Sequence, residues 1–280
     1  MNAFDSAIAS LEQKAAGAIK AEQGDYIVDG LLYCGKCKTP KQTRITIFDT
    51  VRTPFCLCRC EMEKREREEE ERKRQEFEKQ VRDFRRMGFP DAEMQSYTFA
   101  NDDKSNPKIT KAMQAYVENF REMRKSGKGL LLYGTVGTGK TFAACEVANA
   151  LVDKGYPVMV TNFARLTNTI QGMFDGKQEY IDSLNRFSLL VIDDLGAERK
   201  SEFMQEMVYN IIDSRYRAGL PMLITTNLAI NEITTPSDIG NARIYDRILE
   251  RCFPIEVAGV SRRREAVRRE FGDMKAMLGM

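Results

Sequence analysis

The chain has 280 residues, of which 42% are hydrophobic and 30% charged, and its formal net charge is +2. This length allows one large domain or two, and the nearly neutral charge confines any nucleic-acid contact to a local basic patch. Histidine is absent, which excludes Ser-His-Asp triads, Cys-His nucleophiles and histidine-based zinc proteases. Because no apolar run could cross a bilayer and residues 1–22 lack the apolar core of a secretory signal, we expect a cytoplasmic protein with no membrane partner.

Residues 1–60 are predicted to form an N-terminal helix and a small zinc-binding module. Apolar residues recur at helical spacing between Phe4 and Ile19. A C-x-x-C pair, a strand-like segment at 45–48 and a C-x-C-x-C cluster follow. Thiolates at this spacing suit tetrahedral Zn²⁺, and zinc stabilises modules too small to fold by burial alone. We expect the zinc ligands to be Cys34, Cys37, Cys58 and Cys60.

Three cysteines lie outside this expected ligand set. Cys56 could replace Cys58 or Cys60, because the second cluster supplies one sulfur more than the site needs. Free or redox-active thiols are the alternative to a metal site. Cys145 and Cys252 stand apart from the cluster and are predicted to be small buried side chains.

Residues 61–87 are predicted to be a linker, because their composition shifts sharply to Glu, Lys and Arg. Acids and bases nearly balance, which favours a solvated helix with i,i+4 ion pairs, or a flexible tether, over a nucleic-acid-binding arm. Gly88-Phe89-Pro90 ends the charged run. We therefore place the domain boundary near residue 88.

Residues 88–280 are predicted to form an α/β domain, because helical and strand-like apolar patterns alternate from residue 109 onward. The expected fold is a parallel sheet flanked by helices. Strands are predicted at 130–133, 157–160, 189–194, 222–227 and 255–257. Helices are predicted at 109–125, 142–151, 201–218, 243–251 and 262–277, with a long, partly apolar stretch at 163–185.

The segment between the strand at 130–133 and the helix at 142–151 reads G-T-V-G-T-G-K-T. In this strand–turn–helix context, G-x-x-x-x-G-K-[ST] indicates a phosphate-binding loop. Glycines let the backbone approach a phosphate, and the N–H groups at the start of the helix favour its charge. Lys140 is expected to bind the β- and γ-phosphates, and Thr141 the Mg²⁺ ion. The nucleotide-binding residues are therefore predicted to be Gly134, Thr135, Val136, Gly137, Thr138, Gly139, Lys140 and Thr141.

Two carboxylates, Asp193 and Asp194, end the apolar strand at 189–194. The carboxyl ends of parallel strands are where an open sheet places its catalytic groups. Asp193 is expected to hold Mg²⁺ opposite Thr141, and Asp194 to orient a water molecule toward the γ-phosphate.

Three further polar residues are candidates for catalysis. Asn227 ends the next strand and could hydrogen-bond the attacking water or the γ-phosphate. Arg243 and Arg247 lie four residues apart, on one face of a predicted helix. An arginine that reaches a neighbouring subunit's γ-phosphate accelerates hydrolysis by roughly 10³–10⁵, although an ordinary surface helix would carry the same arginines.

Together these motifs resemble the DnaC/DnaI/IstB-type AAA+ ATPases over residues 88 to about 270. The resemblance rests on the glycine-rich loop, L-L-V-I-D-D-L-G-A-E, T-T-N, R-I-Y-D-R and G-V-S-R-R in this order. It implies an AAA+ core with Walker A at 134–141, Walker B at Asp193 and Asp194, and sensor 1 at Asn227.

The resemblance also assigns roles to three arginines. Arg247, or else Arg243, would be the arginine finger, and Arg263 the sensor-2-like arginine. One position departs from the pattern, because the superfamily usually has Glu after the metal-binding Asp. Asp194 is one methylene shorter, so either hydrolysis is slow or Glu198 assists it.

The expected partners also follow from the resemblance. Members with a cysteine-rich N-terminal module look like helicase loaders of bacteria and phages, in which that module binds a hexameric replicative DNA helicase. The ATPase domain engages single-stranded DNA through the segment between the Walker motifs, here 162–186. The candidate DNA contacts are Arg165, Phe174, Lys177 and Tyr180, whereas Phe163, Leu166 and Ile170 are as well explained as packed core.

The expected function is an ATP-dependent helicase loader that uses ATP, Mg²⁺ and Zn²⁺ and self-associates when ATP is bound. An ATPase helper of a DNA transposase is the alternative, because it shares the same core, although such helpers generally lack the cysteine module. A small-molecule kinase is disfavoured by the paired arginines, the sensor asparagine and the absence of an evident lid for an acceptor substrate.

Overall fold

The computed structural model describes residues 21–47, 50–197 and 201–278, and the predicted helix at 4–19 lies outside them. The chain divides into two compact units, residues 1–77 and 78–280. Among the described helices, none combines the length and the apolar character that a bilayer crossing requires.

The first unit contains two short antiparallel hairpins. β1 (Tyr26–Val28) pairs with β2 (Leu31–Tyr33), and β3 (Ile45–Ile47) pairs with β4 (Thr50–Arg52). Strands of three residues bury little apolar surface, and among the described side chains of this unit the buried hydrophobic ones are Cys34 and Cys58. A core this small requires a further cross-link to hold the hairpins in place.

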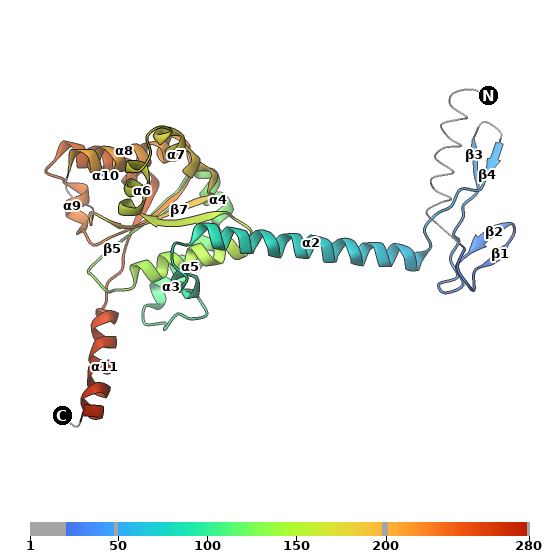
Figure 1. The fold of residues 1–280 in the computed structure, drawn as a ribbon, viewed down its shortest axis with the longest axis horizontal. Helices are drawn as coiled ribbons and strands as arrows, with labels where there is room; N and C mark the ends of the chain where they lie inside the picture. The colour runs from blue at the N-terminus through green and yellow to red at the C-terminus, as the bar shows by residue number, and fades with distance from the viewer. Residues whose placement is uncertain (1–20, 48–49, 198–200, 279–280) are drawn as a thin grey trace. The chain divides into compact units, whose positions relative to one another are not determined.

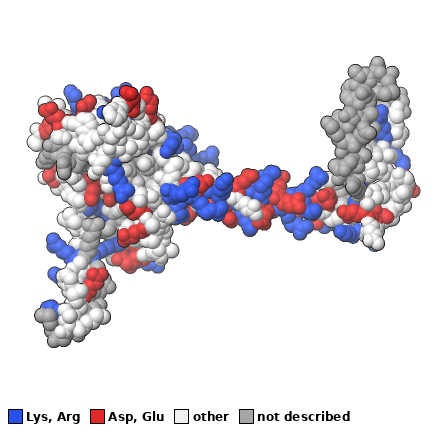
Figure 2. All heavy atoms as spheres, in the orientation of Figure 1, with Lys and Arg blue, Asp and Glu red and all other residues white. Residues whose placement is uncertain are grey.

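The charged segment forms one helix, α2 (Arg59–Gly88), which confirms the helical form of the predicted linker. Residues 62–80 are exposed, and Figure 2 shows both signs of charge mixed along the helix. Ion pairs join residues four apart, such as Lys64 with Glu68 and Glu69 with Lys73. Such pairs stabilise a helix that has no tertiary contacts. Near the end of α2, Val81 and Phe84 pack against the core of the second unit.

The second unit is built on a five-stranded parallel sheet. Its strands are β5 (Gly129–Tyr133), β6 (Val158–Asn162), β7 (Leu189–Leu195), β8 (Met222–Thr226) and β9 (Cys252–Glu256), in the order β6-β7-β8-β5-β9. The inner strands are almost continuously apolar because both faces of a parallel sheet are covered. The strand of the glycine-rich loop, β5, lies between β8 and β9, so three strand ends meet beside the loop.

Helices cover both faces of this sheet (Figure 1). Leu130 and Leu132 of β5 pack on one face with α3 (Pro107–Glu118), α4 (Phe120–Ser126) and α5 (Lys140–Asp153). Leu131 packs on the opposite face with α6 (Phe163–Gln171), α7 (Lys177–Ser183), α8 (Glu202–Arg217) and α10 (Ile239–Arg251). The remaining elements are α9 (Ile230–Thr234), α11 (Arg262–Leu278) and the 3-10 turns η1 (Glu93–Ser96) and η2 (Leu184–Arg186). The predicted parallel sheet flanked by helices is confirmed.

Two predicted elements differ from the structure. The helix expected at 109–125 is divided at Asn119, whose side-chain amide donates to the Ala115 carbonyl and competes with the backbone hydrogen bonds. The stretch at 163–185 forms two short helices instead of one, separated by a turn that contains Gly172 and Gly176. Glycine destabilises a continuing helix, so the break falls where two of them occur close together.

Candidate nucleotide-binding site and cysteine cluster

The glycine-rich loop connects β5 to α5 and requires glycine at particular positions. Gly134 and Gly137 have φ angles of 145° and 87°. A Cβ atom on Gly137 would lie 2.2 Å from Ser261 Oγ, and one on Gly134 would lie 2.6 Å from the Val257 carbonyl oxygen. Larger residues are therefore excluded by both backbone conformation and close packing. The loop has the compact form that a phosphate-binding turn requires.

Lys140 is buried at the centre of this loop, with 6% of its surface exposed. Its Nζ atom donates to the carbonyl oxygens of Gly134 and Thr135 at 2.9 and 2.8 Å, and to Asn227 Oδ1 at 2.7 Å. The ammonium group is thus fixed against the loop that leads into the start of α5, and a helix start favours an anion. This arrangement fits the triphosphate of a nucleotide.

Thr141 and Asp193 lie in contact. The Thr141 hydroxyl donates to Asp193 Oδ1 at 2.9 Å, and the Thr225 hydroxyl donates to the same oxygen at 2.6 Å. Burial raises the pKa of Asp193 above its ordinary value, and the two threonine hydrogen bonds oppose this shift. A hydroxyl and a carboxylate at this distance are the oxygen ligands that Mg²⁺ prefers.

Asp194 is presented by an irregularity in the sheet that the sequence did not reveal. The register between β7 and β8 shifts between Ile192 and Leu195, and Asp194 has a φ of 56°. A bulge of this kind redirects a side chain at the end of a strand. The exposed carboxylate of Asp194 accepts a hydrogen bond from Asn227 Nδ2 at 3.0 Å. Lys140, Asn227 and Asp194 therefore form one continuous hydrogen-bonded chain.

These groups border a pocket of about 350 Å³, a volume suited to a small organic ligand. Tyr97, Phe142 and Arg262 also line it, and none of them was predicted. Arg262 pairs with Asp103 at 3.3 Å, and its backbone N–H donates to the Gly137 carbonyl at 2.9 Å. The side chain of Arg263, the predicted sensor arginine, lies outside those described. The sequence signal for Arg262 is the run of three arginines at 262–264, which does not indicate which of them faces the loop.

The predicted zinc ligands converge in the first unit. The sulfur atoms of Cys34, Cys37, Cys58 and Cys60 all lie within 4.8 Å of one another. Cys56 is outside this group, and its thiol contacts the Pro40 carbonyl at 3.5 Å. Four convergent thiols, two of them in a C-x-x-C turn, have the chemistry and spacing of a structural zinc site. Cys145 and Cys252 are buried, as predicted.

A family model described as IstB-like ATP binding protein matches residues 62–270. The chain belongs to this family. The match covers the whole sheet and the glycine-rich loop of the second unit, and it agrees with the AAA+ P-loop fold found there.

The chain shares about a quarter of its residues with individual relatives over the matched regions. It is 27% identical over 181 residues to the replicative helicase loader DnaI of Bacillus subtilis (strain 168), covering 59% of this chain and 58% of that protein. It is 26% identical over 178 residues to the replicative helicase loader DnaC of Escherichia coli (strain K12), covering 61% and 69%. A crystal structure of DnaI superimposes with a TM-score of 0.51 and 26% identity, over 63% of this chain and 95% of that one. The sequence match with DnaI spans less than two thirds of the length of that protein.

The two candidate finger arginines do not line the pocket of their own chain. Arg247 Nε lies 2.7 Å from Asp213 Oδ1, and Nη2 donates to the Tyr209 hydroxyl at 2.8 Å. Its guanidinium also lies 4.7 Å from the centre of the Tyr209 ring. Arg247 therefore ties α10 to α8, whereas Arg243 is exposed. The finger role of either residue stays a prediction.

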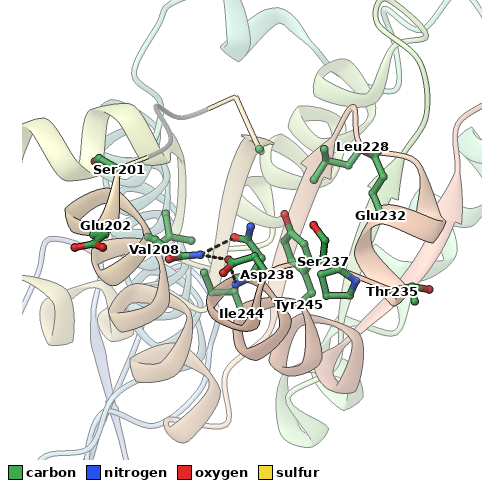
Figure 3. Close-up of a pocket in the computed structure, with 14 residues that line it drawn as sticks. Ser201, Glu202, Val208, Leu228, Glu232, Thr235, Ser237, Asp238, Ile244 and Tyr245 are labelled. Carbon is green, nitrogen blue, oxygen red and sulfur yellow. Dashed lines mark hydrogen bonds between the residues drawn. The ribbon is translucent and has the colours of Figure 1, made fainter.

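A larger pocket of about 540 Å³ lies between the start of α8 and the start of α10 (Figure 3). Its ionisable lining side chains include the carboxylates of Glu202, Glu232 and Asp238, and among the described lining residues there is no lysine or arginine. Its described lining therefore offers a triphosphate no basic side chain, unlike the smaller pocket that contains Lys140.

The segment proposed to contact DNA divides into buried and exposed residues. Phe163, Leu166 and Ile170 are at most 1% exposed, which confirms that they are packed core. Phe174 is fully exposed in the turn between α6 and α7, and Lys177 beside it is also exposed. Arg165 pairs with Asp91 at 3.1 Å, and Tyr180 packs partly against the core.

Proposed function

We propose that this IstB-like protein is an ATP-dependent loader of a replicative DNA helicase. Its N-terminal module binds the hexameric helicase, and its ATPase unit delivers the ring to single-stranded DNA at replication initiation, in the cytoplasm. The observation that carries the proposal is the similarity of the P-loop unit to two proteins that are both named replicative helicase loaders.

The proposed enzymatic activity is ATP hydrolysis with Mg²⁺. Lys140 and the N–H groups at the start of α5 hold the phosphates, and Thr141 and Asp193 hold the metal ion. When bound, Mg²⁺ would neutralise part of the negative charge of the phosphates. Asp194 orients a water molecule, and Asn227 keeps Asp194 and Lys140 in register. Because the Asp194 side chain is short, hydrolysis is expected to be slow unless Glu198, outside the described residues, assists it.

The proposed helicase-binding module is held together by zinc. The four convergent thiols support this, because the hairpins around them have almost no apolar core of their own. Zinc would be bound by Cys34, Cys37, Cys58 and Cys60, which leaves Cys56 as a free thiol.

The proposed contact with single-stranded DNA centres on Phe174. A fully exposed aromatic ring has no role in core packing and is suited to stack on a base. Lys177 is exposed close by and could contact a phosphate. Substitution of Phe174 by Ala should weaken single-stranded DNA binding about tenfold, while Phe253→Ala, which removes another exposed aromatic ring on β9, should leave DNA binding unchanged.

ATP-bound copies are proposed to associate, with an arginine of α10 in one copy reaching the γ-phosphate held by the next. Arg243 is exposed and could do so without loss of a contact, whereas Arg247 would have to leave Asp213 and Tyr209. Loss of hydrolysis without loss of ATP binding in Arg243→Ala or in Arg247→Ala would identify the finger.

The experiment that tests the proposal uses the full chain, ATP, the replicative helicase of the same organism and a closed single-stranded DNA circle. We expect a stable complex with the helicase and ATP-dependent transfer of the helicase onto the circle. Lys140→Ala should block transfer, Cys34→Ser combined with Cys37→Ser should abolish the complex, and Cys56→Ser should behave as wild type. Failure of the wild-type chain to bind the helicase would contradict the proposal.

The alternative function is that of an ATPase helper of a DNA transposase. The match to the IstB-like ATP binding family supports this alternative, because transposase helpers and helicase loaders share the same ATPase core. Retention of a transposase on the immobilised full chain, with no retention of the helicase in a parallel experiment, would support this alternative.

A further inference from the structure

The nucleotide pocket is lined by two chemically different kinds of side chain. Lys140, Thr141, Asp194 and Asn227 are polar and suit phosphates and a metal ion, and Arg262 adds a second cation. Tyr97, Val136 and Phe142 contribute aromatic or aliphatic side chains. A nucleoside triphosphate needs both kinds, because its polyanion is joined through a sugar to a flat aromatic base.

Two of the apolar lining side chains are rings that lie against each other. The centroids of Tyr97 and Phe142 are 4.9 Å apart, with an angle of 35° between the ring planes. Phe142 belongs to the first turn of α5 and is fixed by that helix. Tyr97 instead follows the short turn η1, outside the sheet and its covering helices. The position of Tyr97 therefore depends on whatever holds η1 in place.

Asn149 holds it there. This residue of α5 is 1% exposed, and its Nδ2 atom lies 2.9 Å from the Met94 carbonyl oxygen and 3.0 Å from that of Tyr97. The backbone of η1 is thus attached to α5 at the start and the end of one short turn. Loss of this buried amide would remove the donor that joins both carbonyl groups to α5, and the loss of hydrogen bonds to part-buried groups is costly.

The same amide is held from its other side by the end of α2. Arg85 Nη1 donates to Asn149 Oδ1 at 2.7 Å, and Arg85 also pairs with Asp153 of α5. All of these residues belong to the second unit. A continuous set of hydrogen bonds therefore runs from Arg85 through Asn149 to the backbone of Tyr97.

We propose that Tyr97 and Phe142 form the base-binding end of the nucleotide pocket, and that Asn149 and Arg85 are positioning residues that couple the end of α2 to nucleotide affinity. This inference rests on the proposed binding of ATP and extends it. Tyr97 and Phe142 contact the base, whereas Asn149 and Arg85 act through Tyr97. A displacement of the end of α2 would move the base-binding ring and leave the phosphate loop in place.

The test compares two ligands that share the phosphates and differ in the base. The affinity of the full chain is measured for ATP and for inorganic tripolyphosphate, each in the presence of Mg²⁺. Tyr97→Ala and Asn149→Ala should weaken ATP binding about tenfold, because base stacking contributes roughly 1–3 kcal/mol. Both variants should bind tripolyphosphate within about twofold of wild type, whereas Lys140→Ala should lose both ligands.

Controls separate positioning from general loss of structure. Tyr97→Phe keeps the ring and should bind ATP with the affinity of the wild type, unlike Tyr97→Ala. Arg85→Ala leaves Asn149 in place and should show the same selective loss for ATP, while Arg82→Ala, which removes an exposed ion pair with Glu78 on α2, should change neither affinity. Equal weakening of both ligands in Tyr97→Ala and Arg85→Ala, or no weakening of either, would overturn the proposal. Wild-type chain that bound tripolyphosphate and ATP equally would also overturn it, and would leave the phosphate site intact.

Discussion

Lys140 and Asn227, 87 positions apart in the chain, are joined by a hydrogen bond of 2.7 Å. The bond connects the phosphate loop to the end of β8, and the Asn227 amide continues it to Asp194 at 3.0 Å. One side chain therefore bonds both the proposed phosphate-binding cation and the proposed water-orienting carboxylate.

This contact predicts that Asn227→Ala lowers the rate of ATP hydrolysis roughly 10²-fold while ATP affinity changes little. The Ala side chain leaves Asp194 unheld, whereas the loop carbonyls still bind Lys140. Steady-state hydrolysis and calorimetric ATP binding check the two parts. Asn231→Ala, on the exposed surface of α9, is the matched control, and an unchanged hydrolysis rate in Asn227→Ala would contradict the assignment.

Asp194→Asn is predicted to bind ATP normally and to lose hydrolysis by roughly 10²–10⁴-fold. Asn tolerates the φ of 56° found at this position, so the bulge is retained and the carboxylate alone is removed. Single-turnover hydrolysis with bound ATP is the measurement. Hydrolysis at the wild-type rate would transfer the role of Asp194 to another group, with Glu198 as the first candidate.

The parts of this site that sequence predicts best are those encoded by neighbouring residues. The glycine-rich loop is eight consecutive positions, and Asp193 follows an apolar run whose burial is evident from composition. Asp194 is different, because its orientation depends on a register shift between two strands that are distant in sequence. Arg262 and Asn149 were missed for a similar reason. Packing between distant segments decides which of the three consecutive arginines at 262–264 faces the loop, and which helical amide is buried against η1.

The cysteine cluster illustrates the same limit. Spacing selects Cys34 and Cys37, but it cannot decide among the three sulfurs at 56, 58 and 60. The structure brings Cys58 and Cys60 to the first pair and leaves Cys56 against Pro40.

Purified wild-type protein is therefore predicted to contain about one zinc per chain, since one four-thiolate site holds one ion. Zinc should be absent from the variant that combines Cys34→Ser with Cys37→Ser and present at the wild-type level in Cys56→Ser. Elemental analysis after removal of loosely bound metal gives the stoichiometry. A wild-type protein that contains no metal after purification without a chelator would contradict the zinc assignment.

Glu146 predicts a pH dependence of stability. This residue of α5 is 2% exposed, and its Oε1 atom makes no hydrogen bond with the described residues. Burial raises its pKa to about 8, and the neighbouring Asp102 carboxylate adds to the shift while Arg262 opposes it. The folded state therefore binds a proton more tightly than the unfolded state, whose Glu has its ordinary pKa of 4.5. Stability contributed by the protonated group is complete below that value and is lost as pH rises through about 8.

Urea unfolding of the wild type and of Glu146→Gln at pH 6 and pH 9, followed by circular dichroism, checks this prediction. The wild type should lose more stability than Glu146→Gln between the two values, because Gln cannot ionise. An equal loss in both proteins would show that Glu146 does not carry the dependence.

Lys140 and the loop around it are proposed to bind the triphosphate of ATP. Isothermal calorimetry with Mg²⁺ and ATP, on the wild type, on Lys140→Ala and on the exposed control Lys111→Ala, is the decisive measurement. The wild type and Lys111→Ala should each bind one ATP, and Lys140→Ala should show no detectable binding. Equal ATP affinity in all three proteins would contradict this proposal.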